Sequence, residues 1–232
     1  MAYGLAMTFA PYWQTFPALS GYPEFAHAFT LRHPEIDVKV DRDEAVRRLW
    51  AWHYEIASQL GFPASHLATA QQIHGAEVAV VDRPVKAGDP VPAVDGLISR
   101  EPGLAIGIYV ADCCAVYLLD PVSGAFGILH SGKKGSELGI TSIAIRKMAE
   151  NFGTKPENLI VQLSPCIRPP VYEVDFAAAI REQAASAGVP LAQIHDEGVC
   201  TSSDTEKFYS YRLEKGKTGR MFAILGRRAT TV

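Results

Sequence analysis

The sequence predicts a layered domain of the α+β or mixed α/β class. Segments typical of strands outnumber segments typical of helices along the 232 residues. Three apolar runs follow one another at 104–110, 115–119 and 125–129, and each is bounded by turn residues, which is typical of strands buried on both faces. The hydrophobic content of 48% is enough for one large domain or two small ones.

The first 60 residues contain one predicted strand and one clear predicted helix. The run FAHAFTL at 25–31 predicts a strand. Apolar residues recur at helical spacing over 42–60, Asp41 is suited to be the N-cap, and Gly61 is suited to end the helix. His53 lies on the apolar face of this helix, so we expect it to be a packed core histidine.

His74 lies between two predicted strands, at 67–73 and 77–81. A further short strand is predicted at 94–99. The run 83–92 contains several prolines and a glycine, and we interpret it as a surface loop within one domain.

The segments after the central runs alternate between helix and strand. The spacing predicts helices at 136–151 and 176–187 and strands at 159–163 and 221–225. The turn SGKKG at 131–135 offers several backbone N–H groups near a helix start, which suits an anion, although an ordinary tight turn has the same composition.

Charge and hydropathy exclude several classes of protein. The formal net charge of −3 argues against a general nucleic-acid binder, because phosphate contacts need clustered lysine and arginine. No stretch approaches the roughly 20 uncharged apolar residues that cross a bilayer. The apolar N-terminus has no Lys or Arg before its hydrophobic part and makes a poor signal peptide, so we expect a cytoplasmic location.

These properties also predict the organisation of the chain. We expect residues 1–24 to be an extension that packs on the domain or on a partner, and residues 25–232 to be a single domain. We expect a small-molecule substrate, neither a nucleic-acid nor a membrane partner, and a monomer or small homo-oligomer.

The four cysteines show no CxxC spacing, so a zinc ribbon and a thioredoxin-type pair are both disfavoured. Cys114 should face away from Cys113 if the strand continues, and we expect it in the core. Cys166 and Cys200 are expected to be core or loop thiols.

A candidate site combines His74, Cys113 and His130. Cys113 and His130 each follow the end of an apolar run, and both would emerge at one sheet edge if the first and third runs are parallel neighbours. His74 lies in a His-Gly turn after a predicted strand, so the same edge is available to it. Two imidazoles and a thiolate suit zinc, and three protein ligands leave a fourth position open, as in catalytic sites. Asp112 could orient one ligand through a hydrogen bond.

Other interpretations of the same three residues stay open. Their softness also admits Cu(I). A metal-free Cys–His pair could act as a nucleophile. The three side chains could also be unrelated, because buried free cysteines and His-Gly pairs are common.

An ordered set of short motifs resembles the bacterial laccase-domain family, whose members are also called polyphenol-oxidase-like or purine nucleoside phosphorylase proteins. The match runs from about residue 25 to the C-terminus, and its motifs in chain order are Gln72-x-His74-Gly75, Asp95-Gly96-Leu97, Ala111-Asp112-Cys113, His130-x-Gly132-x-x-Gly135, Pro165-Cys166-Ile167, Tyr172-Glu173-Val174, Cys200-Thr201, Phe208-x-Ser210-Tyr211-Arg212 and Thr218-Gly219-Arg220.

The resemblance implies a catalytic zinc site formed by His74, Cys113 and His130. It also implies mixed sheets in layers with outer helices, a fold similar to that of cytotoxic necrotising factor deamidases. The implied activities are phosphorolysis of adenosine, inosine or methylthioadenosine, and deamination of adenosine. Copper-dependent oxidation of phenols and amide hydrolysis in a peptidoglycan precursor are further activities attributed to the family.

The sequence departs from the family pattern around the implied ligands. The usual HAGWRG is HSGKKG at 130–135, so an aromatic and an arginine are replaced by Lys133 and Lys134. The family's loop after the position of Arg32 is shortened. Ala115 and Arg168 replace a proline and a glycine of the family. These changes predict a divergent member of the family, with intact metal ligands and altered residues around the substrate.

The leading hypothesis is therefore a zinc enzyme acting on purine nucleosides. The alternatives are an amide hydrolase for cell-wall precursors, a copper-dependent phenol oxidase, and a non-catalytic paralogue that binds a metal or a partner. Glu173 could be an acid–base group, although a structural contact is the simpler interpretation. Phosphorolysis needs an anion site, for which the candidates are Arg32, Lys133, Lys134 and Arg220.

Overall fold

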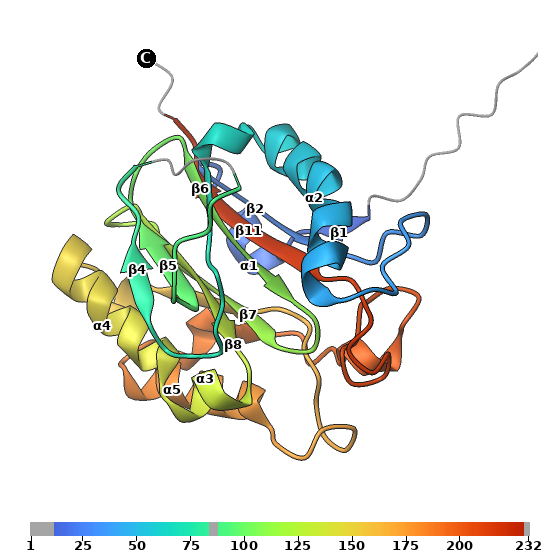
Figure 1. The fold of residues 1–232 in the computed structure, drawn as a ribbon. Helices are drawn as coiled ribbons and strands as arrows, with labels where there is room; N and C mark the ends of the chain where they lie inside the picture. The colour runs from blue at the N-terminus through green and yellow to red at the C-terminus, as the bar shows by residue number, and fades with distance from the viewer. Residues whose placement is uncertain (1–11, 84–87, 230–232) are drawn as a thin grey trace, which may run out of the picture.

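The computed structural model describes residues 12–83 and 88–229, which form two mixed β-sheets packed face to face between helices (Figure 1). The strands are β1 (Trp13–Gln14), β2 (Phe25–Thr30), β3 (Leu67–Thr69), β4 (Val78–Val80), β5 (Gly96–Ser99), β6 (Leu104–Val110), β7 (Cys114–Asp120), β8 (Ala125–Ser131), β9 (Ile160–Leu163), β10 (Ile194–Asp196) and β11 (Met221–Arg227). The helices are α1 (Pro17–Ser20), α2 (Arg42–Gln59), α3 (Lys133–Glu137), α4 (Ile140–Phe152) and α5 (Phe176–Ser186), with 3₁₀ turns at Ala64–His66, Pro156–Asn158, Leu191–Gln193 and Thr201–Ser203.

One sheet has five strands in the order β1-β2-β11-β6-β3, and the other has six in the order β10-β9-β7-β8-β5-β4. Helix α2 covers the outer face of the five-stranded sheet, and α3, α4 and α5 lie on the far side of the six-stranded sheet (Figure 1). The prediction of an α+β fold with layered mixed sheets and outer helices is confirmed.

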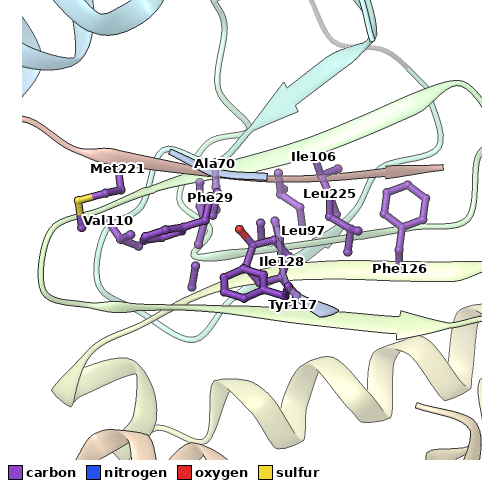
Figure 2. Packing of buried hydrophobic residues seen from close by; sticks show 14 of the residues in the cluster. Phe29, Ala70, Leu97, Ile106, Val110, Tyr117, Phe126, Ile128, Met221 and Leu225 are labelled. Atoms are coloured by element: carbon purple, nitrogen blue, oxygen red, sulfur yellow. The ribbon is translucent and has the colours of Figure 1, made fainter. Parts of the chain in front are cut away.

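The main core fills the space between the two sheets, as Figure 2 shows. Phe29 and Leu225 from one sheet face Tyr117 and Ile128 from the other, and all four are fully buried. The hydroxyl of Tyr117 donates a hydrogen bond to the carbonyl of Ala28 at 2.8 Å, which satisfies its polar end inside this core. Burying one such side chain stabilises the fold by about 1.5–3 kcal/mol, so the sheet-to-sheet interface holds the molecule together.

The predicted arrangement of the three central runs is wrong in one respect. Strand β6 belongs to the five-stranded sheet, whereas β7 and β8 are antiparallel neighbours in the six-stranded sheet. The first and third runs are therefore not parallel neighbours. The segment between β6 and β7, which contains Cys113, crosses from one sheet to the other. His130 lies inside β8, paired with Ala115, and not beyond the strand end.

Two other predicted elements differ in length. The strand expected at 67–73 ends at Thr69, because the following segment adopts left-handed backbone at Gln72 (φ 61°) and His74 (φ 60°). The helix expected at 136–151 is two helices, α3 and α4, separated by Gly139 with a φ of 78°.

Most other predictions about the core are confirmed. Helix α2 begins after Asp41, whose side chain accepts hydrogen bonds from two backbone N–H groups of the first turn. His53 on this helix is buried at 1% exposure, and Cys114 is fully buried. Cys166 is also buried, and Cys200 pairs with it through an isolated β-bridge.

The segment before residue 25 joins the main sheet where it is described. Strand β1 pairs antiparallel with β2, and Phe16 and Leu19 are completely buried in the core between the sheets. The division at residue 24 stays a prediction, and its first 11 residues lie outside the described part of the chain. No helix in the described segments has the length and apolar character that a membrane crossing requires.

Candidate metal centre

The three candidate ligands converge although they come from three different elements. His74 lies in the loop between β3 and β4, Cys113 lies in the crossover between the sheets, and His130 lies in β8. Their ligand atoms are all within 4.8 Å of one another, and they form the one group of three or more potential metal ligands found in residues 12–83 and 88–229. His74 is exposed, Cys113 is partly exposed and His130 is buried, so the group opens toward solvent on one side.

A buried carboxylate, Asp95, holds both histidines in place. It has no exposed surface and accepts a hydrogen bond from Nδ1 of His130 at 2.8 Å. It also accepts backbone N–H bonds from Ile73 (3.1 Å), His74 (2.9 Å) and Gly75 (2.6 Å), which fixes the left-handed turn at His74. Because Nδ1 of His130 is bound to a carboxylate, its Nε2 is the atom left for the cluster.

Gln72 attaches the His74 loop to the five-stranded sheet. Its buried side chain donates to the carbonyl of Tyr109 at 2.6 Å and accepts from the N–H of Tyr109 at 2.8 Å. Strand β3 pairs with β6 only as far as Gly107, so the amide of Gln72 continues the β3–β6 ladder after β3 has ended. This explains physically why a glutamine precedes the histidine by two residues.

Gly132 is required by the close approach of the thiol. A Cβ at this position would lie 2.5 Å from Sγ of Cys113, a distance that no real contact allows. A Cβ at Gly135 would lie 3.2 Å from the carbonyl of Gly75 in the His74 loop. The two glycines of HxGxxG therefore let α3 pack directly against both neighbouring ligand segments.

The electrostatics of the metal-free cluster favour a charged pair. Burial would raise the pKa of Cys113, but the charge of His130 and hydrogen bonds from His130 and His74 lower it to about 6. Burial would likewise lower the pKa of His130, but the charge of Cys113 and the hydrogen bond to Asp95 raise it to about 9. A thiolate is the form that binds a metal or acts as a nucleophile, so the cluster is prepared for either chemistry.

The orienting role predicted for Asp112 belongs to Asp95 instead. The carboxylate of Asp112 accepts hydrogen bonds from the hydroxyls of Thr201 (2.7 Å) and Ser210 (3.1 Å) and from the N–H of Arg212 (2.7 Å). Asp112 thus ties the C-terminal loop to the crossover. The sequence signal for Asp95 was its place in the Asp-Gly-Leu motif, but nothing in that motif indicated a contact with His130.

The cluster lies in the wall of a pocket of about 1230 Å³. Seven cationic and four acidic residues line this pocket, so it favours an anionic or polar ligand. Its aromatic lining offers faces for a flat ring. The cationic residues are Arg42, Lys133, Lys134, Arg212, Lys215, Lys217 and Arg220, the acidic ones are Asp41, Asp112, Glu137 and Glu173, and the aromatic ones include Tyr109, Tyr172, Phe176 and Tyr211.

The structure separates the predicted anion-binding residues into two groups. Lys133, Lys134 and Arg220 line the pocket. Arg32 is outside the pocket lining, ion-paired with Glu214 at 2.6 Å and placed over the ring of a tyrosine. Glu173 lines the pocket but forms an ion pair with Arg212 at 2.6 Å. This agrees with the structural contact that was the simpler interpretation of this residue.

The donor set fits a zinc ion. Ligands at about 2.0–2.3 Å from one tetrahedral ion lie about 3.5 Å from each other, which agrees with a cluster spread over no more than 4.8 Å. Asp95 accepts the hydrogen bond from Nδ1 of His130, and a carboxylate in this position is the usual partner of a metal-bound histidine. A fourth position would face the pocket. The same soft donors also accept Cu(I), so the geometry leaves the identity of the metal open.

Comparisons with known proteins agree with the resemblance in the sequence. The chain matches the family model described as multi-copper polyphenol oxidoreductase laccase over residues 36–178 and 173–228. A protein named purine nucleoside phosphorylase YlmD, from Geobacillus stearothermophilus, is 31% identical over 227 residues, covering 81% of this chain and 80% of its own. The crystal structure of YlmD from that organism has a TM-score of 0.80 at 25% identity, covering 94% of this chain and 100% of the other.

Two further relatives carry different activity names. A protein of Streptomyces coelicolor named purine nucleoside phosphorylase SCO2081 is 36% identical over 190 residues, covering 71% of this chain and 76% of the relative. A protein from an unknown prokaryotic organism named adenosine deaminase RL5 is 27% identical over 222 residues, covering 80% of this chain and 84% of the relative.

Proposed function

The chain belongs to the multi-copper polyphenol oxidoreductase laccase family, and from this premise we propose that it is a zinc-dependent enzyme that acts on purine nucleosides. The reactions that we propose are phosphorolysis of the nucleoside and deamination of adenosine. The names of the relatives support both, because two are named purine nucleoside phosphorylase and one is named adenosine deaminase. A reducing compartment such as the cytoplasm suits a site with a free thiolate.

The observation that carries this proposal is the position of the ligand cluster in a pocket of suitable chemistry. His74, Cys113 and His130 converge in the wall of a pocket that also presents aromatic and cationic side chains. A purine needs an aromatic or apolar face, and phosphate needs positive charge. When bound, zinc supplies Lewis acidity, which lowers the pKa of water and polarises a substrate oxygen.

The chain's own residues would hold the ligands and the substrate. Asp95 would keep His130 in one tautomer with Nε2 directed to the cluster. Tyr172 and Phe176 form an edge-to-face pair in the pocket lining, with ring centroids 5.8 Å apart, and offer an aromatic wall for the base. Lys133 and Lys134 follow the ligand strand directly and would place positive charge beside the reacting group.

The two reactions differ in nucleophile and leaving group. In phosphorolysis, an oxygen of phosphate bonds to C1′ of the ribose while the C1′–N9 bond breaks, and the base leaves after gaining a proton. In deamination, water adds to C6 of the purine ring and ammonia leaves from the same carbon, with proton transfer from the water to the departing nitrogen. The site needs an anion-binding group only for the first reaction, so product analysis separates the two.

The test is metal content together with turnover of a panel of purine nucleosides, for wild type and for Cys113→Ala. We expect about one zinc per chain in wild type and loss of both metal and turnover in the variant. Free base with ribose 1-phosphate identifies phosphorolysis, and inosine formed from adenosine identifies deamination. The matched control is Cys200→Ser, because Cys200 is another partly exposed thiol but lies outside the pocket lining.

The result can contradict the proposal in two ways. Wild type without metal would remove the zinc site. Zinc-loaded wild type that leaves every nucleoside unchanged would remove the substrate assignment and leave a metal protein with another substrate.

A further inference from the structure

The antiparallel register places Arg220 next to the crossover that contains Cys113. Strand β11 pairs with β6 so that Met221 lies opposite Val110. Arg220 directly precedes Met221, and Ala111 directly follows Val110, so Arg220 is next to the start of the crossover in this register. Arg220 has only 7% of its surface exposed, and it lines the pocket. A buried arginine therefore lines the same pocket as the thiol of the ligand cluster.

Arg220 has no carboxylate to neutralise it. Its Nη1 donates to the carbonyls of Thr218 and Gly219, both at 2.9 Å, and in the described part of the chain it forms no ion pair. Asp112 is a carboxylate whose charge acts on Arg220, but it is already engaged by Thr201, Ser210 and the N–H of Arg212. A buried cation without a carboxylate partner is costly, and a bound anion would remove the cost.

A second guanidinium, Arg42, faces the same pocket from the first turn of α2. Its Nη2 donates to the carbonyl of Gln71 at 3.3 Å, next to the residue that anchors the His74 loop. Its ion pair with Asp43, at 3.6 Å, involves a carboxylate that is 91% exposed and therefore screened by water. The side chain of Asp41 caps the helix and is also engaged.

The two arginines influence each other directly. The pKa of Arg220 is lowered, first by its burial and next by the positive charge of Arg42, while the charge of Cys113 opposes this. Like charges held together in a partly buried pocket are destabilising unless a counterion lies between them. Nothing in the sequence had indicated Arg42, because it is the first residue of an ordinary amphipathic helix.

From this geometry we propose that Arg42 and Arg220 form the subsite for a tetrahedral oxyanion, a phosphate group, beside the His74–Cys113–His130 cluster. The inference deepens the proposed function and rests on it for the identity of the substrate. The phosphate comes either free, as the second substrate, or attached to the nucleoside. Planar guanidinium groups bind such oxygens through two parallel hydrogen bonds, which the lysines of the pocket cannot do.

The experiment measures binding of inorganic phosphate to the zinc-loaded protein by calorimetry, in wild type, Arg42→Gln and Arg47→Gln. Arg47 is the matched control, because it is an arginine of the same helix that pairs with Glu44 at 2.7 Å and lies outside this pocket. We expect the dissociation constant for phosphate to rise about tenfold or more in Arg42→Gln and to stay within about twofold in Arg47→Gln. Equal affinity in all three proteins would overturn the proposal.

Two additions keep the test clear. Arg42→Lys keeps the charge without the planar fork and should recover part of the affinity. Arg220→Lys also keeps the charge without the planar fork, so it should weaken phosphate binding less than Arg42→Gln does, and circular dichroism would show whether the variant still folds. If Arg220→Lys is folded and binds phosphate normally, Arg220 is not part of the subsite.

Two experiments distinguish free phosphate from a phosphate group attached to the nucleoside. If phosphate is the free substrate, Arg42→Gln raises the KM for inorganic phosphate with a nucleoside as cosubstrate. If it belongs to the substrate, Arg42→Gln weakens binding of a nucleoside 5′-monophosphate and leaves the nucleoside unaffected. Either result supports the subsite, and no change in both arms overturns it. Failure of the proposed function would appear differently, as phosphate binding that depends on Arg42 in a protein that turns over no nucleoside.

Discussion

At the scale of single residues, the site depends on a carboxylate that is not a candidate ligand. Asp95 receives four donors at once, three from the backbone around His74 and one from the ring of His130. Burial would raise its pKa, but the hydrogen bonds from His130 and Gly75 lower it below the usual value, so it stays charged. One buried charge thus fixes two ligands that are distant in sequence.

The first prediction concerns the loss of the negative charge of Asp95. In Asp95→Asn, the amide has one acceptor oxygen for four donors, and its NH₂ group opposes one of them. We expect zinc affinity, measured by competition with a chelator, to fall about 10–100-fold. The control is Asp120→Asn, because Asp120 is an equally buried aspartate that accepts from Val122 and Ser123 in the β7–β8 turn. Unchanged affinity in Asp95→Asn would show that Asp95 does not position the ligands.

At the scale of elements, the side chain of Gln72 holds the His74 loop to the five-stranded sheet. Its amide makes the two hydrogen bonds that the backbone of a neighbouring strand would make. The amide of Gln72 bonds to both backbone groups of Tyr109 where β3 no longer reaches. The loop then turns through left-handed backbone at Gln72 and His74 and closes on Asp95. The ligand therefore keeps a fixed position although it lies on an exposed segment.

The element-scale prediction removes this attachment. Gln72→Leu fills similar space but leaves the N–H and C=O of Tyr109 unpaired, which costs about 1–3 kcal/mol of stability. We expect faster hydrogen exchange at the Tyr109 amide and a loss of zinc affinity of a few fold. Gln71→Ala is the neighbouring control, because the side chain of Gln71 bonds to Ala93 instead. Normal exchange at Tyr109 in Gln72→Leu would argue against the anchoring role.

At the scale of the whole molecule, the site lies where the two sheets meet. The five-stranded sheet contributes Arg220, directly before β11, and His74, in the loop after β3. The six-stranded sheet contributes His130 on β8, and Cys113 lies on the connection between the sheets. Any change that separates the sheets would therefore disperse the site. The core between and around the sheets also buries two histidines, His27 and His53.

These histidines make the whole fold sensitive to acid. Burial lowers the pKa of His53 to about 3 and, with the opposing effect of a hydrogen bond from Phe16, lowers that of His27 to about 4. The unfolded chain, with an ordinary histidine pKa near 6.5, takes up these protons first as the pH falls. Stability is therefore fully present above pH 6.5 and is lost between pH 6.5 and about 4.

We expect each buried histidine to lower the free energy of unfolding by about 1.4 kcal/mol per pH unit in that range. Urea unfolding at pH 7.5 and 5.0 measures this loss. His53→Leu removes a ring whose two nitrogens have no hydrogen-bond partner, and it should reduce the loss at pH 5.0 by roughly 2 kcal/mol. His66→Gln serves as control, because His66 is exposed, and it should leave the loss of unfolding free energy at pH 5.0 unchanged. An equal loss in wild type and His53→Leu would contradict the assignment.

The local elements could largely be predicted from the sequence because they depend on local chemistry. Strand β6 and helix α2 follow from an apolar run and an amphipathic period, and the N-cap at Asp41 follows from its side chain. The three candidate ligands were also visible, as soft donors at strand ends and then as matches to family motifs. Their spatial convergence agrees with the expectation, while their role as metal ligands stays a proposal.

Local patterns along the sequence indicated most of the strands and helices and the α+β class, and the sequence motifs indicated the family and the three donors to consider. The tertiary structure alone decided which strands share a sheet, so β6 and β8 lie in different sheets and Cys113 lies between them. It also decided that Asp95 and not Asp112 supports the ligands, and that Arg42 and Arg220 line one pocket. The physical reason is that sheet pairing, hydrogen bonds and charge contacts join residues far apart along the chain, whereas periodicity and capping report only on near neighbours.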